Sequence, residues 1–149
     1  MPLNPGDCAE PQNTWLRMIT NPNYLKNDGT IHHSAFRGKA ISPPDANKAW
    51  ALELSGALLS LVPDLLTYGQ MQCGDRFLGF MFQGVENLRN QELATDVVFT
   101  PTSDEAHADL VAYHLQEANK RKMEDWLQDF VQLASLNNLQ IIDARRFSA

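Results

Sequence analysis

The chain has 149 residues, of which 44% are hydrophobic and 20% charged, and its formal net charge is −6. A chain of this length and composition forms one globular domain with a sizeable core, not a disordered or fibrous protein. It shows no apolar run long enough to cross a bilayer, no signal-peptide pattern, and too few cysteines for a disulfide framework. We therefore expect a cytoplasmic protein. Its negative charge argues against a nucleic-acid partner.

The N-terminal part of the chain is rich in turn-forming residues. Residues 1–13 contain three prolines and no hydrophobic periodicity. They predict a flexible N-terminal arm ahead of a single domain over residues 14–149. The apolar segment 14–20 fits either a strand or a short helix. Asn27-Asp28-Gly29 predicts a tight turn, because Asp and Gly tolerate positive φ.

Hydrophobic spacing predicts helices in the middle and C-terminal parts of the chain. After the helix entry at Pro43-Pro44-Asp45, apolar residues recur at steps of three and four, as on one face of a helix: Trp50, Leu54, Leu58, Leu61 and Leu65. A further amphipathic helix is expected from residue 102 past Leu115, with an amphipathic stretch over 123–136 that either continues it or forms a separate helix, and a short helix is expected over 85–93. Apolar runs at 77–82, 96–100 and 139–143 predict strands. The order predicts an α+β fold, a single compact domain whose small three- to four-stranded sheet is packed with amphipathic helices.

The tetrapeptide Asp104-Glu105-Ala106-His107 has the spelling of the DEAH box of helicases. In those enzymes the motif works with a phosphate-binding loop that ends in GK[ST]. This chain has no such loop and is too short for a helicase core. The same letters fit a helix N-terminus, because Thr102 and Glu105 match the capping box. Acids also suit the positive end of a helix dipole.

His107 is the first candidate for chemistry, since histidine exchanges protons near neutral pH. On a helix it would share a face with His114, near backbone amides that favour anions. His33 and Asp109 are expected to support it as catalytic residues, and Arg37 and His114 to contact a ligand. Histidines that are merely structural or exposed remain the alternative. The spacing of His107 and His114 is too wide for one metal ion, so we expect no metal and no cofactor.

Several short motifs resemble those of a group of small bacterial proteins without an established activity. They are Asp28-Gly29, Ala35-Phe36, Asp96-Val97 with the downstream Pro101, and Ala106-His107-Ala108. The resemblance covers roughly residues 14–110. It implies a bacterial origin and a single compact domain, and it transfers no catalytic residue.

These patterns favour a binding function over a catalytic one. The negative charge, the lack of a nucleotide or metal motif, and the amphipathic segments favour an accessory or regulatory module that binds another protein, whose gene we expect nearby. Self-association through residues 123–136 would make a homodimer. The alternative is a small histidine-dependent hydrolase or transferase that uses His107.

Overall fold

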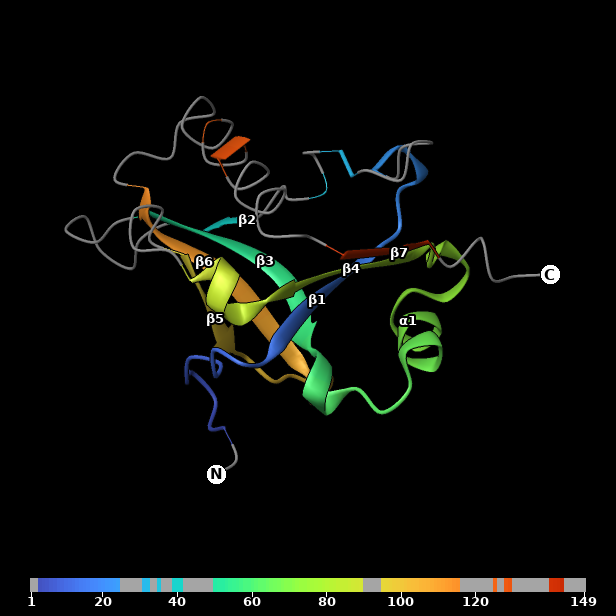
Figure 1. Cartoon of the computed structure of the whole chain (residues 1–149), viewed down its shortest axis with the longest axis horizontal. Helices are drawn as coiled ribbons and strands as arrows, with labels where there is room; N and C mark the ends of the chain where they lie inside the picture. Colours follow the sequence, from blue (N-terminus) through green and yellow to red (C-terminus); the bar gives the residue numbers. More distant parts are fainter. Residues whose placement is uncertain are drawn as a thin grey trace.

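The computed structural model describes residues 3–24, 31–32, 35, 39–41, 50–89, 95–115, 125, 128–129 and 140–143. Within these ranges the chain is mainly β, and seven strands form one antiparallel sheet (Figure 1). The strands are β1 Thr14–Ile19, β2 Lys39–Ile41, β3 Trp50–Leu58, β4 Gly79–Gly84, β5 Thr95–Phe99, β6 His107–Leu115 and β7 Gln140–Asp143. Their order is β5-β6-β3-β1-β4-β7, and β2 pairs with the first half of β3.

The predicted α+β fold, with a three- to four-stranded sheet packed with amphipathic helices, is therefore wrong. Of the helices whose bounds the structure describes, only α1 (Leu65–Cys73) exceeds about one turn. The others are α2 (Val85–Leu88) and the 3-10 turns η1 (Pro22–Tyr24), η3 (Leu59–Leu61) and η4 (Gly74–Arg76). The predicted helix over 123–136 lies almost entirely outside the described residues.

The first part of the segment predicted as the first long helix forms β3, whereas Leu61 lies in η3 and Leu65 begins α1. Leu54 and Leu58 are both fully buried on one face of the sheet. Their spacing of four residues fits one helix face, but four is also a multiple of the strand period of two. Ala57 distinguishes the strand from the helix, because its side chain is buried in a different cluster on the opposite face of the sheet. Its burial follows the alternation of a strand buried on both sides.

The predicted helix that starts at residue 102 is instead a turn followed by the strand β6, and the capping-box interpretation is wrong. Asp104 occupies a turn between β5 and β6, where its Oδ1 accepts from the Ala106 amide at 3.0 Å. Its carbonyl oxygen accepts from the amides of Thr102 and His107. The four letters DEAH thus form the entry to β6, since Asp side chains bond to nearby amides in turns as readily as at helix starts.

Buried side chains cover both faces of the sheet. One cluster contains Trp15, Ile19 and Met81, and the other contains the alternating residues Leu16 and Phe80. The second cluster lies on the α1 side, where Leu65, Tyr68 and Phe77 pack against it. Because β4 is buried on both faces, it reads as a continuous apolar run from Phe80 to Phe82. The runs predicted as strands at 77–82, 96–100 and 139–143 overlap β4, β5 and β7.

The chain segment before β1 lies along the edge of β5 (Figure 1). The Gly6 amide donates to the carbonyl of Phe99 at 2.7 Å, and the Phe99 amide donates to the carbonyl of Asp7 at 2.8 Å. Ala9 continues this pairing with a bond of 2.8 Å to the carbonyl of Val97 and is buried. Residues 6–9 therefore cover the backbone edge that β5 would otherwise expose.

Candidate functional site

Two of the predicted catalytic residues, His107 and Asp109, lie side by side on β6. Strand alternation puts them on one face, and Thr100 at the end of β5 joins them. Thr100 Oγ1 lies 2.9 Å from His107 Nδ1 and donates to Asp109 Oδ2 at 3.1 Å. His107 Nε2 lies 3.6 Å from Asp109 Oδ1. The structure thus forms a Thr–His–Asp cluster, of which Thr100 was not predicted.

Each ring nitrogen of His107 has a neighbour within this cluster. His107 Nδ1 lies 2.8 Å from the carbonyl oxygen of Thr100. A carbonyl oxygen can only accept, so Nδ1 carries a proton and donates it. Nε2 faces the buried carboxylate of Asp109. Both ring nitrogens are directed at neighbouring protein atoms, which fits a ring that holds β5 and β6 together.

The other predicted residues do not join this cluster within the described part of the chain. His114 lies seven residues further along β6, which separates its backbone from that of His107 by roughly 23 Å at the usual rise per residue. His33 and Arg37 lie outside the described residues, and their predicted roles in catalysis and ligand contact stay predictions.

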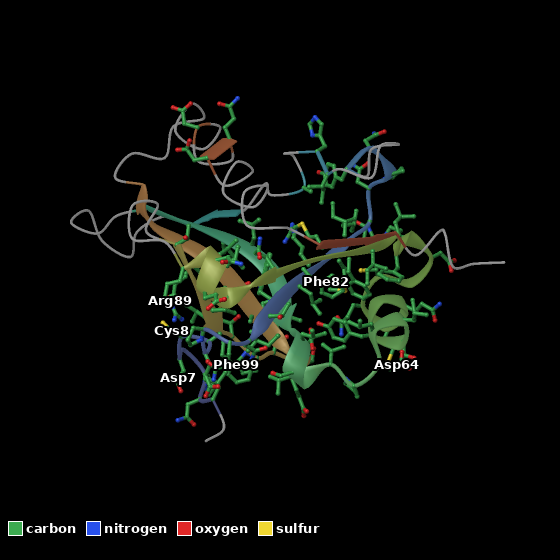
Figure 2. The ribbon with its side chains drawn as sticks, viewed as in Figure 1. Asp7, Cys8, Asp64, Phe82, Arg89 and Phe99 are labelled. Carbon is green, nitrogen blue, oxygen red and sulfur yellow. The ribbon has the colours of Figure 1, made fainter. Side chains whose placement is uncertain are left out.

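A pocket of about 370 Å³ opens at the end of the sheet where the N-terminal segment, η3, β5 and the β5–β6 turn meet. This volume falls at the lower end of the range usual for ligand sites, about 300–1,000 Å³. Within the described part of the chain its lining residues are the apolar Leu3, Leu61 and Phe99 and the polar Glu10, Asn13, Ser60 and Glu105. Figure 2 shows Phe99 on the same side of the molecule as Asp7 of the N-terminal segment.

The polar side chains of this pocket differ in the hydrogen bonds that they make within the protein. Asn13 Nδ2 donates to Ser60 Oγ at 2.9 Å, which ties the N-terminal segment to η3. Glu10 Oε2 accepts from Gln12 at 2.9 Å. Among the described residues, none donates a hydrogen bond to the exposed carboxylate of Glu105. No basic side chain is among the lining residues that the structure describes, and two of those residues are acids.

The turn that carries Glu105 is fixed from the other side by α1. The Tyr68 hydroxyl donates a hydrogen bond to Asp104 Oδ2. Burial, and then this bond to a carboxylate, raise the pKa of Tyr68 above its ordinary value. Tyr68 therefore stays a neutral donor, and it holds the residue next to Glu105 in place.

Sequence reasoning did not find this pocket, because its lining comes from four separate segments of the chain. Glu105 belongs to the DEAH tetrapeptide, but that motif predicted a helix N-terminus and gave no indication of a pocket. Only the packing of residues 3–13 against η3 and β5 brings them together.

No family model, curated protein or solved structure matches this chain. Among the residues that the structure describes, no group of three or more His, Cys, Asp or Glu side chains is placed to hold a metal ion. In the same part of the chain, no helix has the length and apolar character needed to cross a lipid bilayer.

Proposed function

We propose that this protein is a cytoplasmic accessory or regulatory module that binds another protein, and that the pocket at the end of the sheet receives a side chain of the partner. The observation that carries the proposal is the combination of apolar lining residues with two carboxylates that have no basic partner among the described lining residues. Binding pockets combine an apolar lining with a few polar groups that fix orientation. Leu61, which is 45% exposed, gives the pocket an accessible apolar rim.

The alternative is a histidine-dependent hydrolase or transferase, and the pairing of His107 with Asp109 is the observation in its favour. A general base needs a ring nitrogen within reach of the substrate. In this chain Nδ1 is bonded to Thr100 and Nε2 faces Asp109. We therefore favour binding over catalysis.

Peptide selection tests the proposal. A library of displayed random peptides is selected on the wild-type chain, on Ser60→Trp, which adds bulk at the pocket, and on Gln70→Trp, which adds the same bulk on α1. Peptides that bind the wild type and Gln70→Trp but lose at least about tenfold in affinity for Ser60→Trp would support the function, a loss of roughly 1.4 kcal/mol. Peptides that bind all three alike, or no binders at all, would overturn it.

Self-association through residues 123–136 remains a separate proposal, since only Asp125, Gln128 and Asp129 of that segment are described. Sedimentation velocity over a hundredfold range of concentration tests it directly. A sedimentation coefficient that stays at the monomer value throughout would reject the homodimer.

A further inference from the structure

We infer that the side chain received by the pocket is a lysine, whose alkyl stem lies on the apolar lining and whose ammonium group bonds to Glu10 and Glu105. The inference rests on the proposed binding function and adds the chemistry of the occupant. Its basis is the charge and the polarity of the pocket.

The apolar lining suits the stem of a long side chain. Leu3, Leu61 and Phe99 belong to three separate segments and line the same pocket. Lysine buries its methylene groups along apolar surface while its charged end stays near polar groups or water. A short polar side chain would leave this surface exposed to water and would gain little from it.

The carboxylates suit the charged end. Glu105 has no donor among the described residues, and only one oxygen of Glu10 accepts a hydrogen bond within the same part of the chain. An ammonium group has three donors and no acceptor. Two carboxylates from different segments can therefore share it, with the Ser60 hydroxyl as a third acceptor. A planar guanidinium is better matched to a single carboxylate that it holds with two parallel bonds.

Other kinds of occupant fit less well. An acidic side chain would meet two carboxylates on a chain whose formal net charge is −6. A fully apolar side chain would cover the carboxylate of Glu105 without providing a donor, which is unfavourable because a buried charge then stays unpaired. Charge complementarity thus selects a cationic occupant with an aliphatic stem.

The experiment uses N-acetyl-lysine N-methylamide as the probe, with two matched compounds that lack the charge. The first is the norleucine analogue, which keeps the stem, and the second is the Nε-acetyl-lysine analogue, which keeps the length. Chemical shifts of the backbone amides of Ser60, Leu61 and Glu105 are followed by NMR in the full chain. Titrations are repeated with Glu105→Gln and with Asp75→Asn, an exposed acid on η4 outside the pocket.

The inference predicts saturable shifts at these amides with the lysine probe and at least about threefold weaker binding of both neutral compounds. It also predicts a similar loss in Glu105→Gln, no loss in Asp75→Asn, and weaker binding at high salt. Equal shifts with norleucine, or no saturable shifts with lysine, would overturn it. The proposed function is judged separately, since pocket-dependent peptides that share an apolar or acidic anchor would keep the function and reject the lysine.

Discussion

The indole Nε1 of Trp15 donates a hydrogen bond to the carbonyl oxygen of Ala108 at 3.0 Å, although β3 lies between their two strands. The indole reaches β6 by passing over Gly56, where an added Cβ would lie 2.4 Å from both the ring and the carbonyl oxygen of Leu16. Three central strands are thereby joined at one point. Trp15 is only 1% exposed, so its N–H has no water to bond to instead.

Gly56→Ala should therefore destabilise the fold by about 3 kcal/mol, the upper end of the usual cost of overpacking, because backbone atoms meet the new methyl group. Gly84→Ala is the matched control, since an added Cβ there would meet no atom closer than 3.5 Å. Urea unfolding of both variants measures the difference. A Gly56→Ala variant as stable as Gly84→Ala would show that Trp15 is not held over Gly56.

The bond between Tyr68 and Asp104 should contribute stability that depends on alkaline pH. The pKa of Tyr68 is raised by burial and by Asp104, above the value of about 10 for an unfolded tyrosine. The contribution is therefore complete below about pH 10 and is lost as the pH rises further. Tyr68→Phe should cost roughly 1–2 kcal/mol at neutral pH and should flatten the alkaline fall in stability. An unchanged alkaline profile, followed by urea unfolding between pH 8 and 11, would contradict this.

The Thr–His–Asp cluster should act in stability and not in binding. Thr100→Val keeps the shape of the side chain but removes the donor to the buried carboxylate of Asp109. We expect a loss of about 1–3 kcal/mol, the usual consequence of an unsatisfied buried acceptor. Peptide affinity should stay within twofold of the wild type, because no residue of the cluster lines the pocket. Loss of peptide binding in His107→Gln at unchanged melting temperature would instead favour a direct role for His107.

Arg89 should help to form the pocket, because it holds the N-terminal segment in place beside β5. The guanidinium binds Asp96 Oδ1 on β5 at 2.8 Å and the carbonyl of Ala9 at 2.6 Å, and Figure 2 shows Arg89 beside Cys8 of the same segment. A lysine ammonium lacks the planar fork of donors with which the guanidinium reaches both Asp96 and the carbonyl of Ala9. Arg89→Lys should cost about 1 kcal/mol or less, since the ion pair is partly exposed. It should also weaken peptide binding, because Glu10 follows Ala9. If calorimetry shows the same peptide affinity for Arg89→Lys as for the wild type, the position of the N-terminal segment does not affect the pocket.

Sequence predicts best those segments whose length and apolar pattern fit only one kind of secondary structure. The run Phe77–Phe82 is too short for a buried helix and contains the start of β4. In β3, by contrast, the apolar spacing of Leu54 and Leu58 fits both a helix and a strand, and the strand is selected by pairing with β6. Tertiary contacts of this kind cannot be read from local propensity.

The candidate site also has a part that follows from local geometry and a part that depends on tertiary contacts. His107 and Asp109 are two residues apart, so any strand brings them to one face, and their proximity follows from local geometry once the strand is known. Thr100 joins them only through the antiparallel pairing of β5 with β6. The pocket depends on the N-terminal segment lying along β5, for which prolines and missing periodicity give no indication.

The most direct test of the central claim is an NMR shift map of the wild-type chain with a peptide selected on it. Binding at the pocket predicts that the largest shifts fall on the amides of Asn13, Ser60, Leu61 and Glu105. The exposed apolar side chains Leu66 and Met71 on α1 offer the competing surface. Shifts confined to α1, with the pocket amides unmoved, would contradict the account.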